Sequence, residues 1–244
     1  MCACFLHLIL YQTIVQRRTL DFHKGLVQLV EHWSPKPNVG GSSPSLLATF
    51  NENRKYNMLE KIEEYTDRAY ATACRHGFHD EELSEQHLLM LVITEVSEMV
   101  EADRKGRSRS GAEIFEDALR NVKFTEAFEE YMKDSVPDEM ADVCIRLFDL
   151  LGVLNKEERI EFDLLKVIVT NQKKVIGYDY MSFTERAFAL CNILTSRSSV
   201  ERVICRALAF VVKWAQDMKI DLDYHIKMKM QYNEFRANKH GKKY

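Results

Sequence analysis

The chain has 244 residues, of which 46% are hydrophobic and 29% charged, a balance typical of a globular protein with a sizeable core. Its formal net charge of −3 excludes a general electrostatic attraction to nucleic acid or to a membrane surface, so we expect neither as a partner. The scarcity of glycine (9) and proline (4) favours helices over sheets with many turns.

The six cysteines show no CxxC pair and no zinc-ligand spacing with histidine. This pattern indicates a reducing compartment, and we expect a cytoplasmic protein without a disulfide framework. The apolar run at residues 1–15 lacks the basic start of a signal peptide, and it is too short and too often interrupted to span a bilayer.

Residues 1–57 differ from the rest of the chain. They hold three of the four prolines, six basic residues against three acidic ones, and no sustained helical or strand period. Residues 25–45 also resemble the peptide that results when a transfer-RNA gene is translated. We therefore expect a disordered or spurious extension over 1–57 and one functional domain over 58–244.

From Met58 onward the pattern is helical. The first predicted helix covers residues 58–75 and stops near Gly77. A second, capped by Ser84, runs to about Arg104. Its apolar stripe has the 3.6-residue period of a helix and consists of Leu88, Leu89, Val92, Val96, Met99 and Val100.

The middle of the chain is predicted as a loop over 106–111 and a helix plus a loop over 112–133. Ser135, with Pro137 just inside the start, opens the next helix, and Gly152 closes it. Its apolar stripe consists of Met140, Val143, Cys144, Leu147 and Leu151.

The remainder contains a β-branched run at 164–170 that fits either a strand or part of a helix. Further helices are predicted at 185–195 and 200–219, the latter with a capping box formed by Ser198 and Glu201. A last helix, capped by Asp221, runs to about Ala237. No long alternating segment is present, so the predicted fold class is all-α, a helical bundle with helical insertions.

Two predicted helices each carry an acid-x-x-acid pair, Glu95 with Glu98 and Glu139 with Asp142. A spacing of three residues places both side chains of a pair on one helix face, at the edge of the apolar stripe. If the two helices pack together, four carboxylates converge and repel one another unless a cation lies among them.

All-oxygen ligands favour Mg²⁺, with Mn²⁺ as a possible substitute, and Mg²⁺ binds phosphate oxygens readily. A di-iron site is excluded because none of the histidines follows a glutamate at the required three-residue spacing. The alternative is that both acid pairs are ordinary charges on solvated helix faces.

The last predicted helix carries Lys229, Asn233 and Arg236 on one face. An ammonium, an amide and a guanidinium in a row suit a polyphosphate. The alternative is a solvated basic terminus that complements the helix dipole.

In this order, the two acid pairs and the basic helix resemble the MazG-like branch of the all-α nucleoside triphosphate pyrophosphohydrolases. Neighbouring residues are similar as well, over 84–107, 135–152 and 221–244. The resemblance implies hydrolysis of a ribo- or deoxyribonucleoside triphosphate to the monophosphate and pyrophosphate. Such a reaction would serve nucleotide-pool house-cleaning. It also implies a homodimer or homotetramer.

The resemblance assigns roles to individual residues. The four acids bind Mg²⁺, and Glu98 is also the candidate catalytic base. The candidate phosphate ligands are Lys229, Asn233 and Arg236. Glu101 is a spare ligand or an outer contact of the metal site, and Asp149 is an outer or nucleoside contact, with a surface salt bridge as the alternative.

The sequence departs from the family in two insertions, at about 108–134 and 153–219, which leave the substrate open. The alternatives within enzymes are a dUTPase or a phosphoribosyl-ATP pyrophosphohydrolase-like enzyme. The alternative outside enzymes is a non-catalytic helical interaction module whose acids are only surface charge.

Overall fold

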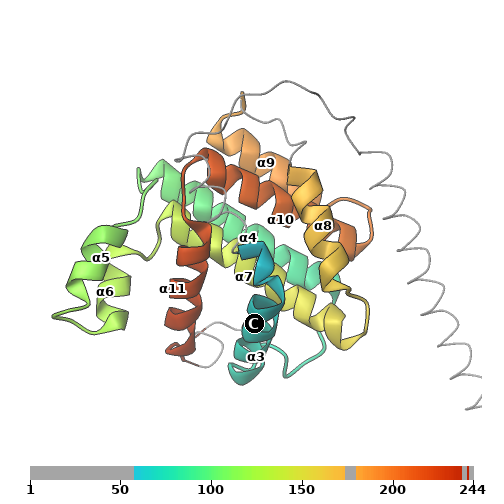
Figure 1. The fold of residues 1–244 in the computed structure, drawn as a ribbon, viewed down its shortest axis with the longest axis horizontal. Coiled ribbons are helices and arrows are strands. Elements are labelled where there is room, and N and C mark those ends of the chain that lie inside the picture. The colour runs from blue at the N-terminus through green and yellow to red at the C-terminus, as the bar shows by residue number, and fades with distance from the viewer. Residues whose placement is uncertain (1–57, 174–179, 238–240, 242–244) are drawn as a thin grey trace, which may run out of the picture. The chain divides into compact units, whose positions relative to one another are not determined.

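A computed structural model describes residues 58–173, 180–237 and 241 of the chain. These residues form the helices α3 to α11 and no strand, so the predicted all-α class is confirmed (Figure 1). The expectations for residues 1–57, and for most of the basic tail after Ala237, lie outside the described residues. Within the described part of the chain, no helix has both the length and the apolar character needed to cross a membrane.

Helices α4 (Glu85–Arg104) and α7 (Val136–Lys156) pack side by side along their length (Figure 1). Each begins at a serine whose hydroxyl accepts a backbone N–H one turn later, because the first N–H groups of a helix have no partner within it. Ser84 accepts from His87, and Ser135 accepts from Asp138. The predicted apolar stripes form the contact. Their buried members are Leu88, Val92, Val96, Met99, Met140, Val143, Cys144, Leu147 and Leu151.

Helices α3 (Ile62–Arg75) and α11 (Leu222–Glu234) also pack against α7. Helix α3 ends before Gly77, whose positive φ of 75° stops the helix as predicted. The carboxylate of Asp221 caps α11 by accepting from the Tyr224 N–H. Helix α11 ends three residues before the predicted end at Ala237.

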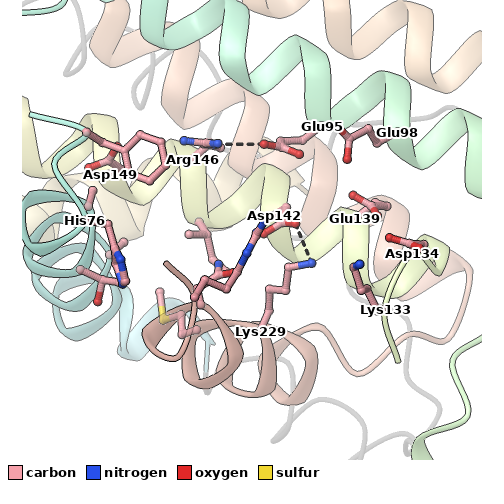
Figure 2. A pocket seen from close by; sticks show the side chains of 18 residues that line it. His76, Glu95, Glu98, Lys133, Asp134, Glu139, Asp142, Arg146, Asp149 and Lys229 are labelled. Atoms are coloured by element: carbon pink, nitrogen blue, oxygen red, sulfur yellow. Dashed lines mark hydrogen bonds and ion pairs between the residues drawn. The ribbon is translucent and has the colours of Figure 1, made fainter. Parts of the chain in front are cut away.

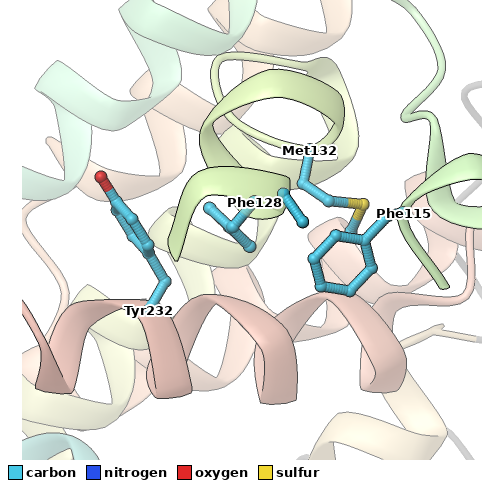
Figure 3. Packing of buried hydrophobic residues seen from close by; sticks show 5 residues of the cluster. Phe115, Phe128, Met132 and Tyr232 are labelled. Carbon is cyan, nitrogen blue, oxygen red and sulfur yellow. The ribbon is translucent and has the colours of Figure 1, made fainter. Parts of the chain in front are cut away.

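The first insertion contains two short helices, α5 (Ala112–Ala118) and α6 (Phe124–Tyr131), instead of the predicted helix plus loop. The two helices form a hairpin that packs on one side of α11 (Figure 1). An apolar cluster joins the hairpin to α11 (Figure 3). Its buried members are Phe115, Ala127, Phe128, Met132 and Tyr232. The hairpin is therefore attached to the same helix that carries the predicted phosphate ligands.

The second insertion contains α8 (Phe162–Lys173), α9 (Phe183–Leu194) and α10 (Val200–Asp217). The ambiguous run at 164–170 is thus helical. Helix α10 is buried over most of its length against α7, α8 and α9. These helices extend the core on the side of α4 and α7 away from α11 (Figure 1).

The predicted capping box at the start of α10 is wrong. The N-cap is Ser199, which makes no side-chain capping bond. The Glu201 carboxylate instead accepts from the guanidinium of Arg159, 2.8 Å from Nε. Glu201 thus anchors α10 to the segment that follows α7, and it is not available to cap its own helix.

The predicted end of α7 at Gly152 is also wrong, because the helix continues to Lys156. Gly152 is buried against Tyr70 of α3, and a Cβ atom at Gly152 would lie 2.4 Å from the Tyr70 Cβ. The glycine therefore permits close approach of two helices. A helix-ending glycine and a helix-packing glycine are indistinguishable by residue type alone.

Candidate metal centre

A pocket with a cavity volume of about 120 Å³, partly open to solvent, lies between α3, α4, α7 and α11. Figure 2 shows its side chains, with Glu95 and Glu98 entering from α4 and Glu139 and Asp142 from α7. All four predicted metal ligands and all three predicted phosphate ligands line this pocket.

Three of the four predicted metal ligands meet closely. Glu95, Glu139 and Asp142 each offer a carboxylate oxygen, and these oxygens all lie within 4.8 Å of one another. Glu95 and Glu139 are each only 4% exposed. The three-residue spacing on α7 brings Glu139 and Asp142 to one face, and the packing of α4 on α7 adds Glu95.

Glu98 and Glu101 occupy different positions from those three acids. Glu98 is exposed but lines the pocket, so it lies at the edge of the carboxylate cluster (Figure 2). Glu101 lies outside the pocket lining, and its carboxylate pairs with Arg104 at 2.8 Å and with Lys105 at 3.5 Å. The structure therefore does not bring Glu101 into the site.

Two carboxylates of the cluster, those of Glu139 and Glu95, are unfavourable as anions. Burial, reinforced by the charge of Asp142, raises the pKa of Glu139 to about 9. Burial and the charge of Asp142 also raise the pKa of Glu95, although its ion pair with Arg146 opposes that rise. Since a bound cation would favour the charged forms, the same groups would bind it with the release of protons.

Lys229 is buried beside the cluster, and its ammonium binds two carboxylates. Nζ lies 2.7 Å from Oδ2 of Asp138. It also lies 2.8 Å from Oδ2 of Asp142 (Figure 2). Burial opposes the charge of Lys229, but Asp142, Asp138 and Glu139 more than offset this effect, and the pKa of Lys229 is raised. The lysine is therefore a cation held at the edge of the pocket.

The other two predicted phosphate ligands also face the pocket. Asn233 is 7% exposed, and its Oδ1 atom has no hydrogen-bond partner among the described residues. Arg236 lies two residues beyond the end of α11 but still lines the pocket, where its guanidinium is 6.0 Å from the ring centroid of Tyr232. Lys229, Asn233 and Arg236 therefore all line the pocket, although α11 ends before Arg236.

The sequence did not predict a role for two charged residues in or beside the pocket, Asp138 and Arg146. Asp138 is 1% exposed and pairs with Lys229, and Arg146 donates from Nε to Oε1 of Glu95 at 3.0 Å. A signal exists for Arg146, because it follows Asp142 by four residues and so shares its helix face. Asp138 carries a weaker signal, as an acid directly preceding Glu139 on the same helix.

Helix α3 contributes a wall of the pocket that the sequence did not predict. Ala69, Thr72 and Ala73, at spacings of three and four residues, form one side of the pocket. At the same end, the carboxylate of Asp149 is 5% exposed and lies 2.7 Å from Nε2 of His79. Asp149 therefore lines the pocket from a buried position and does not form a surface salt bridge.

The residues present fit a hard divalent cation. The cluster offers only oxygen atoms, and Oε2 of Glu139 is buried without a hydrogen-bond partner among the described residues. A buried acceptor without a partner is costly, and a cation would satisfy it.

Comparison of the chain with protein-family models, with curated proteins and with solved structures finds no match in any of the three.

Proposed function

We propose that the chain is a Mg²⁺-dependent nucleoside triphosphate pyrophosphohydrolase of the MazG-like kind. The observation that supports this most is the convergence of three carboxylates within 4.8 Å in a pocket that Lys229 also lines. Oxygen ligands for a hard cation beside a buried ammonium form a site suited to a phosphate chain.

The metal would be held by Glu95, Glu139 and Asp142, and Glu98 lines the same pocket. When bound, Mg²⁺ supplies positive charge against the triphosphate and acidifies a nearby water. Mn²⁺ would substitute, because it accepts the same oxygen ligands. Glu101 has no part in this site.

Glu98 is the proposed general base. It is the one predicted ligand that stays outside the close group of three while lining the pocket, so its carboxylate is free to orient a water or accept its proton. The water oxygen bonds to the α-phosphorus, the bond from that phosphorus to the bridging oxygen breaks, and pyrophosphate leaves with the electron pair. The choice of the α-phosphorus comes from the family resemblance.

Lys229, Asn233 and Arg236 are the proposed phosphate ligands. An ammonium and a guanidinium offset the negative charge that grows on the departing pyrophosphate. The side-chain NH2 group of Asn233, which lines the pocket, would donate hydrogen bonds to phosphate oxygens. Asp149, which also lines the pocket, would accept a hydrogen bond from the nucleoside.

A panel of ribo- and deoxyribonucleoside triphosphates, with dUTP and phosphoribosyl-ATP included, tests the proposal. Product identification should show monophosphate and pyrophosphate only when Mg²⁺ or Mn²⁺ is present. Glu98→Gln should lower the turnover number by about 100-fold or more, in the range of a lost general base. Asp142→Asn should weaken metal binding.

The matched control is Glu101→Gln, the same change one helical turn from Glu98 but outside the pocket, which should leave turnover unchanged. The absence of both metal binding and pyrophosphate release across the panel would favour a non-catalytic interaction module. The proposal includes a homodimer or homotetramer, as the resemblance implies, and a cytoplasmic location, as the cysteine pattern indicates. A monomer in light scattering at micromolar concentration would contradict the proposed oligomer.

A further inference from the structure

The α5–α6 hairpin reaches the lysine of the candidate site. The ring of Phe128, on α6, lies with its centroid 5.7 Å from Nζ of Lys229. An ammonium over an aromatic face is stabilised by the ring, and more so when water is excluded. Lys229 is 4% exposed, so this contact is buried.

The hairpin is fixed to α11 right beside that lysine. Phe128 stacks on Tyr232 with ring centroids 4.4 Å apart and an interplanar angle of 14° (Figure 3). Tyr232 lies three residues after Lys229, which is one helical turn. Its hydroxyl also donates to Oε1 of Glu129 on α6, at 2.8 Å. The ring stack and this hydrogen bond together hold α6 against the turn of α11 that carries Lys229.

Asp138 completes the arrangement from the other side. Its Oδ2 atom accepts from the ammonium of Lys229 at 2.7 Å and from the backbone N–H of Asp134 at 3.0 Å. Asp134 has a positive φ of 56° at the end of the hairpin segment. Asp138 does not line the pocket, unlike Asp142. Its carboxylate therefore faces the lysine and not the space where a ligand would bind.

We propose that Asp138 and Phe128 are positioning residues that hold Lys229 where it can contact a phosphate. The ammonium has three donors, of which Asp138 and Asp142 each take one. If Asp142 turns its charge to a metal, Asp138 still holds the lysine. This inference gives the first insertion a role, and it rests on the proposed function through the phosphate contact of Lys229.

The test measures metal binding, pyrophosphate binding and hydrolysis separately on the full chain. Asp138→Asn keeps the shape and the bond from Asp134 but removes the charge. It should weaken the binding of inorganic pyrophosphate with Mg²⁺, and lower kcat/KM, by about 10- to 100-fold, the scale of a misplaced binding group. Its affinity for Mn²⁺ alone should stay within about threefold of the wild type. Asp117→Asn, the same change at an exposed site on α5, should alter none of these.

A second pair of variants tests the hairpin. Phe128→Leu removes the aromatic face but keeps an apolar side chain, and it should weaken pyrophosphate binding by about three- to tenfold. Phe115→Leu is the matched control in the same cluster, since Phe115 meets Phe128 edge-on at 6.2 Å. It should lower the melting temperature similarly without a change in pyrophosphate binding.

A double-mutant cycle decides whether Asp138 acts through Lys229. In a Lys229→Met background, Asp138→Asn should have no further effect on pyrophosphate binding, and the double variant leaves no unpaired charge between these two positions. An equal effect of Asp138→Asn in both backgrounds, or none in the wild type, would overturn the inference.

If the wild type binds magnesium pyrophosphate but hydrolyses no nucleotide, the proposed reaction fails while the cycle still tests the positioning. If it binds no pyrophosphate, both fail.

Discussion

The guanidinium Nε of Arg146 lies 3.0 Å from Oε1 of Glu95, so a partly buried cation pairs with one of the three clustered carboxylates. The same guanidinium lies 5.3 Å from the ring centroid of Phe78. Arg146 thus competes with a metal for the charge of Glu95, and it also holds that carboxylate in place. Removing a positive charge from beside a cation site should favour the cation.

We therefore expect Arg146→Met to bind Mn²⁺ about tenfold more tightly than the wild type, by calorimetry. Without metal the variant should be less stable by about 3 kcal/mol, because a half-broken buried ion pair leaves a carboxylate without its partner. Saturating Mn²⁺ should recover most of that loss. Weaker Mn²⁺ binding would show instead that Arg146 acts mainly by orienting Glu95.

Glu139 predicts a proton linked to metal binding. Its pKa is raised to about 9, so at pH 7 it carries a proton that a metal must displace. We expect the release of about one proton per metal at pH 7, seen as a dependence of the calorimetric heat on the ionisation enthalpy of the buffer. Affinity should rise with pH up to about 9 and then level off.

The control for this proton is Glu139→Gln, which should bind metal more weakly but with little buffer dependence. A wild-type heat that is the same in all buffers would contradict the prediction. Glu101→Gln, outside the pocket, should behave as the wild type does.

His225 predicts a loss of stability in mild acid. It is 6% exposed, and burial lowers its pKa from 6.5 to about 4. Between these two values the unfolded chain binds the proton and the folded chain does not, so the free energy of unfolding falls as the pH is lowered from 6.5 to 4. The loss from this residue should reach at most about 3 kcal/mol and stop growing below pH 4.

Urea unfolding at pH 4 to 7 measures this effect by comparison with His225→Gln, which retains a group able to bond the Ser110 hydroxyl 3.2 Å from Nε2. The wild type should lose stability relative to the variant as the pH falls. Parallel curves for the two proteins would show that His225 titrates normally in the folded state.

A larger side chain at Gly152 should lower the stability of the protein, because α3 packs closely against α7 at this residue. Alanine is the better helix former by about 1 kcal/mol, but its Cβ would lie 2.4 Å from the Tyr70 Cβ and 2.7 Å from the Tyr70 Cγ. We expect Gly152→Ala to destabilise the protein by about 1–3 kcal/mol, the usual cost of overpacking. Thermal unfolding measures it.

The comparison variant is Gly106→Ala. Its Cβ would meet no atom within 4 Å, and only the positive φ of 73° opposes it. It should cost about 1 kcal/mol, for the left-handed backbone alone. A Gly152→Ala protein at least as stable as the wild type would contradict the close approach of α3 and α7.

The features that the sequence predicts well are local ones. Caps at Ser84, Ser135 and Asp221 depend on a residue and its neighbours within one turn, and so does the facing of each acid pair. The all-α class follows from the same short-range periodicity. The positions of Glu95, Glu139 and Asp142 in one pocket needed only the further assumption that two amphipathic helices pack along their stripes.

The features that it missed depend on partners distant in sequence. The bond between Lys229 and Asp138 joins residues 91 positions apart, and that between Arg146 and Glu95 spans 51. The predicted capping box of Ser198 and Glu201 is wrong for the same reason, because the Glu201 carboxylate binds Arg159 and not the N-terminus of its own helix. Residue spacing carries no information about such pairs. The α3 wall was missed because small residues such as Ala69 and Ala73 have no chemistry that marks a pocket.

Helix α7 carries two of the clustered acids and is buried on nearly every side, with α3, α4, α10 and α11 around it. Its amide hydrogens should therefore exchange with solvent only when the whole fold opens. The pocket is partly open to solvent, so any widening that admits a larger ligand should come from motion of α3 and α11, while α7 stays still. Slow amide exchange in α7, with faster exchange in α3 and α11 that a bound nucleotide suppresses, would be the signature of that division.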